Sequence, residues 1–126
     1  MSNPQKAKGD RAEREVQALL RDLLGVPARR KLGAGRADDM GDIDGVHDTC
    51  IQVASYADVA RALREKVPGC VDQQTRMGAT FGATFLRRPG GRYVVAMTPE
   101  QFAALWREAT AGTADAAVGR PGGTAA

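Results

Sequence analysis

The segment GDIDGVHDTCIQVASY, residues 41–56, decides the fold of this 126-residue chain. Two short apolar stretches, Asp42–Val46 and Cys50–Tyr56, flank the turn-like triplet at residues 47–49. Runs with β-branched residues on either side of such a polar triplet are typical of strands joined by a tight turn. The segment therefore predicts an antiparallel hairpin.

The position of the turn determines which side chains of this hairpin lie together. With the turn centred on Asp48, Asp42 pairs with Ala54 and Asp44 pairs with Gln52. Side chains alternate between the two faces of a strand, so these four are expected on one face. This face collects two carboxylates and an amide, and it is a candidate functional surface.

Apolar periodicity and turn residues predict the other elements. In the N-terminal part these are a helix from Ala12 to Leu24 ended by Gly25 and Pro27, an edge strand at Ala28–Leu32, and a loop at Gly33–Gly41. In the C-terminal part they are a helix from Ala57 broken at Pro68-Gly69, a helical stretch at Val71–Met77, a hairpin of Phe81–Leu86 with Tyr93–Met97, and a last helix. Strands and helices in this order predict an α/β fold.

The last helix has the clearest local signal in the chain. Thr98 is the expected N-cap, with Pro99 at the first helical position and Gln101 completing a capping box. One face of the helix then carries four apolar side chains, those of Phe102, Leu105, Trp106 and Ala109. We expect this face to pack in the core or in a dimer interface.

Composition limits the class of protein. With 43% hydrophobic and 26% charged residues, the chain is close to an average globular protein, which excludes a wholly disordered or fibrous one. No apolar run approaches the roughly 18 residues of a membrane span, so we expect a cytoplasmic protein. Residues 1–110 are predicted to form a single domain, and residues 111–126, rich in Ala and Gly, a flexible tail.

The chain favours oxygen ligands for any metal ion. It has only two cysteines, without CxxC spacing, and one histidine, which argues against a structural zinc site. Cys50 is expected to be a buried, reduced thiol without chemistry of its own. His47, beside Asp48, is interpreted as a polar turn residue.

Carboxylates on the first helix extend the polar face of the hairpin. Glu13 falls at the edge of the apolar stripe, where it either joins a site or pairs with a neighbouring arginine, and Glu15 lies outside the stripe. Glu13, Asp42 and Gln52, with Asp44 as an accessory residue, offer the oxygen ligands that suit Mg²⁺. A bound Mg²⁺ polarises a phosphoryl oxygen and activates water, which is the chemistry of phosphodiester hydrolysis.

These residues resemble a known family. Lys8-Gly9 and then Glu13-Arg14-Glu15 form a KGxxxERE-like start, followed by Gly41-Asp42-Ile43 and Ile51-Gln52-Val53. Together they are similar to the PD-(D/E)XK nucleases, and within them to the archaeal-type and phage Holliday junction resolvases. The resemblance covers Lys8–Met97. It implies a restriction-endonuclease-like core, with a mixed sheet flanked by helices, in a symmetric homodimer.

The resemblance also implies roles for single residues. Glu13 and Asp42 correspond to acidic metal ligands, and Gln52 to the acidic or amide residue of the (D/E)XK element. The carbonyl of Val53 is a possible further ligand. The cofactor implied is Mg²⁺, with Mn²⁺ as an alternative, and a phage origin would place the protein in the host cytoplasm.

One position departs from the family. Its lysine, which offsets charge in the transition state, belongs two residues after Gln52, where this chain has Ala54. Three explanations compete: an alanine substituted to inactivate the enzyme, a lysine role relocated to Lys31 or Lys66, and a protein that binds without cutting. We favour the first, because the rest of the segment is intact.

Clustered basic residues predict contacts with DNA phosphates. The candidates are Lys8, Arg29, Arg30, Lys31 and Arg36, with a further patch at Arg87, Arg88 and Arg92. The function expected is that of a metal-dependent, structure-selective endonuclease that makes symmetric cuts in Holliday junctions, with branched or duplex DNA as partner. The alternatives are a non-catalytic DNA-binding protein of the same fold, and a nicking or linear-duplex nuclease.

Overall fold

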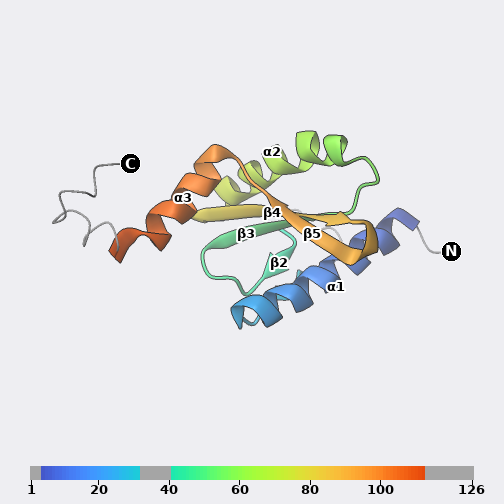
Figure 1. Cartoon of the computed structure of the whole chain (residues 1–126), viewed down its shortest axis with the longest axis horizontal. Coiled ribbons are helices and arrows are strands. Elements are labelled where there is room, and N and C mark those ends of the chain that lie inside the picture. Colours follow the sequence, from blue (N-terminus) through green and yellow to red (C-terminus); the bar gives the residue numbers. More distant parts are fainter. Residues whose placement is uncertain (1–3, 32–40, 113–126) are drawn as a thin grey trace.

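The computed structural model describes residues 4–31 and 41–112, apart from the side chain of Gln5. Its elements are α1 (Pro4–Leu24), β1 (Arg29–Arg30), β2 (Ile43–Asp44), β3 (Thr49–Ala54), α2 (Val59–Met77), β4 (Phe81–Arg88), a 3-10 turn (Pro89–Gly91), β5 (Arg92–Ala96) and α3 (Pro99–Ala109). The strands form one sheet in the order β1-β2-β3-β4-β5 (Figure 1), with β3 and β4 parallel and the other neighbours antiparallel. The predicted α/β class is confirmed.

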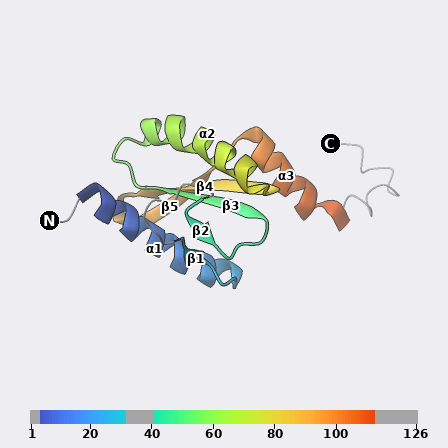
Figure 2. The same cartoon turned by 180° about the vertical axis from the view of Figure 1, so that it is seen from behind.

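Helices cover both faces of the sheet. Figures 1 and 2 show α1 on one face and α2 with α3 on the other. The main core lies under α1, where Val16 and Leu20 pack with Ile51, Val53 and Phe85. A smaller cluster lies on the α2 face and is formed by Ala54, Ala62 and Leu86. Alternation along β3 therefore directs Gln52, like Ala54, toward α2.

The predicted register of the first hairpin is wrong by two residues. Ile43 pairs with Ile51, whereas a turn centred on Asp48 would pair it with Val53. The connection is longer than predicted, because β2 ends at Asp44 and Gly45 and Asp48 both adopt left-handed conformations, with φ of 89° and 53°. A shift of two keeps every side chain on its expected face. Asp42, Asp44, Gln52 and Ala54 thus still belong to one face.

The predicted break at Pro68-Gly69 is also wrong. α2 runs from Val59 to Met77 with Pro68 inside it, between an Asp58 N-cap and a left-handed Gly78 C-cap. Pro68 is exposed, while Ala62 and Cys70, on either side of it along the helix, are buried against the sheet. Packing of the apolar face therefore outweighs the hydrogen bond that proline removes.

The C-terminal elements match their predictions except in burial. β4 and β5 form the predicted hairpin, and Thr98 and Gln101 make the capping box of α3. Phe102 and Trp106 are 58% and 59% exposed, so they do not join the core of this chain. Of the two packing interpretations, only an interface with another molecule remains open.

Three regions lie outside the described residues: 1–3, 32–40 and 113–126. They include Arg36, most of the predicted loop at Gly33–Gly41, and nearly all of the predicted tail. The expected edge strand at Ala28–Leu32 is present as β1, at one edge of the sheet. No helix in the described part of the chain is long and apolar enough to cross a membrane.

Candidate functional site

Asp42 lies where β2 begins, directly against the edge of β3. Its Oδ2 accepts a hydrogen bond of 2.8 Å from the backbone N–H of Val53, and its own N–H donates to the carbonyl of Ile51 at 2.8 Å. The N–H and C=O of one strand residue point to the same side of the strand. The Val53 carbonyl is therefore directed to the edge occupied by the Asp42 carboxylate, and two oxygen ligands share this edge.

Gln52 brings a third oxygen to the neighbourhood, on the α2 face. The residue is 3% exposed, and its Oε1 has no hydrogen-bond partner among the described residues. Gln73 Oε1, on α2, is also buried without a hydrogen-bond partner among the described residues. Buried amide oxygens are costly without a partner, so an ordered water or a cation is the expected complement of Gln52.

Glu13 is held on the other side of the sheet. It lies on α1, where its Oε1 is 3.3 Å from Arg30 Nε, and Arg30 also contacts Asp10 at 2.9 Å. The backbone N–H of Arg30 donates to Gln17 Oε1 at 2.8 Å, which ties α1 to β1. Glu13 is thus paired with an arginine, Arg30, and its role as a metal ligand stays a prediction. Within residues 4–31 and 41–112, no three His, Cys, Asp or Glu side chains gather as a metal site.

Ala54 is enclosed at the end of β3. It is 2% exposed and packs with Ala62 and Leu86, and Tyr56 borders the cluster. A lysine here would have to pass its four methylenes through this apolar cluster before its ammonium reached water. Alanine is therefore the side chain that the surroundings of position 54 accommodate.

The two lysines considered for relocation differ in position. Lys31 follows β1, is 14% exposed in its side chain, and lies 3.6 Å from Asp44 Oδ1. Lys66 is on α2 and partly exposed. Asp44 shares the face of Gln52, so this ion pair holds Lys31 at the predicted polar surface.

Both cysteines are free and fully buried. Cys70 Sγ lies 3.8 Å from the carbonyl of Cys50 and 3.6 Å from that of Ala83, which places it between α2 and the two parallel strands. A hydrogen bond with the Cys70 thiol and burial both raise the pKa of Cys50. Cys50 is thus a buried thiol outside any disulfide, as the sequence predicts.

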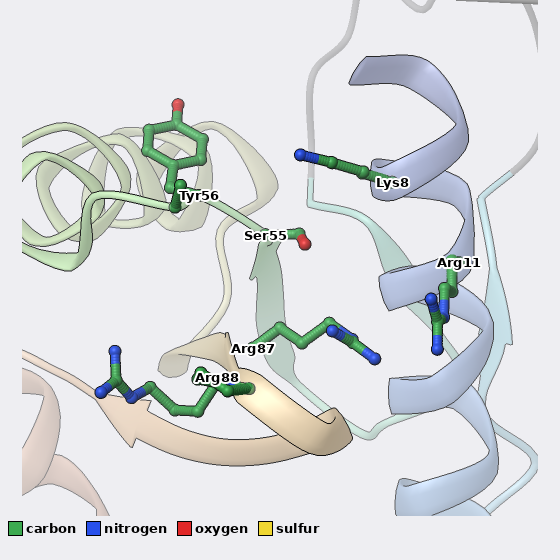
Figure 3. Close-up of a pocket in the computed structure, with 8 residues that line it drawn as sticks. Lys8, Arg11, Ser55, Tyr56, Arg87 and Arg88 are labelled. Atoms are coloured by element: carbon green, nitrogen blue, oxygen red, sulfur yellow. The ribbon is translucent and has the colours of Figure 1, made fainter. Parts of the chain in front are cut away.

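A second feature is a basic cavity at the carboxyl ends of β3 and β4. It has a volume of about 260 Å³ and is lined by Lys8, Arg11, Ser55, Tyr56, Ala57, Arg87, Arg88 and Pro89. Ends of parallel strands are where open α/β sheets commonly bind ligands. Figure 3 shows Lys8 and Ser55 pointing into the space, and Arg87 reaching from β4 toward α1.

Glu15 forms ion pairs with two of these cations, Arg87 and Arg11. Its carboxylate accepts from Arg87 at 2.7 and 3.4 Å, from Tyr93 Oη at 2.8 Å, and from Arg11 at 3.4 Å. The Arg87 guanidinium is the main reason that the pKa of Glu15 falls from 4.5 to about 2. Burial and the nearby Glu15 carboxylate raise the pKa of Tyr93. The Arg87 guanidinium, 18% exposed, is consequently oriented by Glu15, whereas Arg11 is 65% exposed.

The predicted DNA contacts have different environments. Lys8 lines the basic cavity and Arg29 is exposed on β1, whereas Arg30 and Lys31 are engaged in ion pairs with acidic residues. Arg36 lies outside the described residues. The sequence shows Arg11 within an N-terminal cluster of cations but does not single it out, and sequence reasoning missed the Ser55–Ala57 connection. Only the parallel pairing of β3 with β4 brings that connection beside the tip of β4.

Comparisons with known proteins give no match: no protein-family model, no curated protein sequence and no solved structure is significantly similar to the chain. Function is therefore inferred from the residues and their geometry.

Proposed function

We propose that this protein is a metal-dependent endonuclease of branched DNA, similar to the Holliday junction resolvases. The observation that carries the proposal is the position of Asp42, whose carboxylate lies 2.8 Å from the backbone nitrogen of Val53 in the Ile51-Gln52-Val53 strand. The GDI and IQV segments of the sequence thus meet along the edge of β3 that faces β2, inside a mixed sheet. The order of helices and strands is compatible with a restriction-endonuclease-like core.

The residues at this edge fit a magnesium ion. Mg²⁺ is held by one or two carboxylates with further oxygen ligands and waters, which here would be Asp42, the Val53 carbonyl and the unpartnered amide oxygen of Gln52. When bound, Mg²⁺ or Mn²⁺ supplies an activated water and a polarised phosphoryl oxygen. Glu13 lies on the α1 face of the sheet, so it would have to leave its ion pair with Arg30 and also reach past the sheet to add its carboxylate.

The remaining cations assist in different ways. The basic cavity attracts the DNA backbone toward the end of β3, because cations at a partly enclosed site concentrate phosphates. Lys31 carries a positive charge that can stand in for the lysine absent at position 54. Its ion pair with Asp44 holds it on the face of Gln52.

A homodimer suits the proposed substrate. A four-way junction has two equivalent strands to cut, and a two-fold dimer presents two equivalent sites. α3 and the α2 face of β5 expose the large apolar side chains that such an interface needs, namely Val94, Phe102, Leu105 and Trp106. We propose this surface as the dimer interface.

A second candidate function is a DNA-binding protein that does not cut. The enclosure of Ala54 by Ala62 and Leu86 favours it, since a native alanine fits this position without any missing lysine. In that case the chain keeps the fold and the basic cavity, and the phosphodiester bond stays intact. Ala54 is then natural rather than an inactivating substitution.

Cleavage and metal binding separate the two candidates. The protein, its Ala54→Lys variant and an Asp42→Asn variant are each incubated with labelled four-way junction, linear duplex and single strands, with Mg²⁺, Mn²⁺ or EDTA. Symmetric, metal-dependent junction cutting by the Ala54→Lys or unchanged protein, lost in Asp42→Asn, supports the endonuclease. Circular dichroism checks that each variant folds.

A different outcome would exclude the nuclease function. If folded Ala54→Lys and the unchanged protein bind the junction but cut no substrate, and calorimetry detects no Mg²⁺ or Mn²⁺ binding that Asp42→Asn abolishes, the non-catalytic function stands. Cutting of linear duplex with equal efficiency would instead indicate a nuclease without selectivity for branched DNA.

A further inference from the structure

We propose that the basic cavity between α1, the β3–α2 connection and the tip of β4 holds one backbone phosphate of a DNA strand whose neighbouring phosphate reaches the Asp42 edge. Only the placement of the neighbouring phosphate at Asp42 rests on the proposed function. Lys8, Ser55 and Arg87 supply the phosphate ligands, with Arg88 at the rim.

The charge of the cavity matches an anionic ligand. Four cations line it, Lys8, Arg11, Arg87 and Arg88. Glu15 contacts two of them, Arg87 and Arg11, and no carboxylate is among the described residues that line the cavity. One acid among four bases leaves a net positive site, so a phosphate adds its charge without displacing an existing ion pair.

The cations differ in how firmly they are held. Arg87 is only 18% exposed and has its guanidinium oriented by Glu15, which lowers the entropy cost of binding. Lys8 and Arg88 are exposed, and no ion pair engages either of them within the described part of the chain. Figure 3 shows the Lys8 ammonium and the Ser55 hydroxyl directed into the same space. One preorganised and one adaptable cation thus meet a hydroxyl donor.

A second cavity continues from the first and indicates a strand rather than a free ion. It measures about 450 Å³, shares Lys8, Ser55, Tyr56 and Ala57 with the first, and adds Asp58 and Arg61. Tyr56 stands between the two spaces, with the Arg61 guanidinium 5.6 Å from its ring centre. A phosphate alone would leave this space empty, whereas a sugar and base beside a tyrosine and an arginine would fill it.

The cavity is also the right distance from the proposed metal edge. Strand residues rise about 3.3 Å each, so Ser55 lies roughly 7 Å beyond Val53 along the same strand. A single DNA strand can therefore place one phosphate against Ser55 and the next near Asp42. The cavity would position the scissile bond without contacting it, which makes Lys8 and Arg87 positioning residues.

Salt-dependent DNA binding tests the inference. Affinities of the full chain for four-way junction and for single-stranded DNA are measured without metal at several salt concentrations. The Lys8→Ala and Arg88→Ala variants are compared with Arg107→Ala, which removes an equal charge from α3, a helix that contributes no residue to this cavity. Each cavity variant should lower the dependence of log K on log salt by about one, and Arg107→Ala should not.

Amide chemical shifts give a second readout. A short single strand should shift the resonances of Ser55, Tyr56 and Arg87 in the unchanged protein, and the shifts should require a higher DNA concentration in Lys8→Ala. Inorganic phosphate that causes the same shifts at the same concentration would overturn the strand proposal in favour of a free-phosphate site. Unchanged salt dependence in both cavity variants, or no DNA binding by the parent protein, also overturns it.

The test is independent of cleavage. Failure of the nuclease proposal removes metal-dependent cutting but leaves the salt dependence and the chemical shifts of the cavity as predicted. Failure of the cavity proposal leaves cutting by an active form unaffected by Lys8→Ala. The two proposals therefore fail in different experiments.

Discussion

Replacing Glu15 with glutamine should destabilise the protein in a pH-dependent way. The Glu15 carboxylate joins α1 to β4 and β5 through Arg87 at 2.7 Å and Tyr93 at 2.8 Å. These contacts lower its pKa from 4.5 to about 2. A pKa that is lower in the folded protein than in the unfolded chain means that ionised Glu15 stabilises the fold.

The size of the effect follows from this difference. A fall from 4.5 to about 2 corresponds to an upper limit of about 3 kcal/mol. The side chain of Glu15 is 32% exposed, so solvent screening reduces the contribution. We expect Glu15→Gln to lower the free energy of unfolding by about 1–2 kcal/mol at pH 7.

The pH dependence distinguishes the ionic contribution from other losses. The contribution is complete above the unfolded pKa of 4.5 and is lost as the pH falls toward the folded value of about 2. Urea denaturation at pH 7 and pH 3 should therefore show a difference between the two proteins that shrinks to less than half. Glu108→Gln, at an exposed position on α3, is the matched control and should change stability little.

One result would refute this reasoning. If Glu15→Gln destabilises equally at pH 7 and pH 3, the loss comes from packing or from neutral hydrogen bonds, and the ion pair with Arg87 contributes nothing. Unchanged stability at pH 7 would show that the pair is fully screened.

Two further predictions concern the helices. Leu20 is 3% exposed, so Leu20→Ala should lower the free energy of unfolding by about 2–5 kcal/mol in a urea titration. Leu23 is 71% exposed, so Leu23→Ala should leave the free energy of unfolding nearly unchanged. Equal losses of unfolding free energy at both positions would contradict the packing of Leu20 in the core under α1. Pro68→Ala should raise the thermal unfolding midpoint, because α2 continues through this position and alanine restores a backbone donor; a lower midpoint would mean that proline gains more by restricting the unfolded chain.

Local signals predicted the elements whose ends are fixed by neighbouring residues. The end of α1 at Leu24 and the capping box of α3 both follow from residues within a few positions of each terminus. The break expected at Pro68 fails for the opposite reason. Burial of Ala62 and Cys70 against the sheet is a tertiary effect, and it holds the helix together across a residue with a low helix propensity.

The faces of the first hairpin were predictable although its register was not. Alternation alone places Gln52 and Ala54 together, and a slip of two residues preserves that assignment. The register depends on Gly45, whose φ is 89° and where a Cβ would overlap the carbonyl of Pro27. That close approach joins segments from separate parts of the chain, and no pattern within the hairpin reveals it.

The basic cavity was hidden because its residues are joined by topology. Glu15 lies outside the apolar stripe of α1, which predicts a solvated carboxylate, yet its main partner Arg87 is 72 residues away. The two meet because α2 returns the chain parallel to β3, so that β4 ends beside α1. Once that crossover is known, the connection after Ser55 and the tip of β4 must share one end of the sheet, and their basic and hydroxyl side chains line one cavity there. Prediction of such a site from sequence thus requires the strand order first and the residue pattern second.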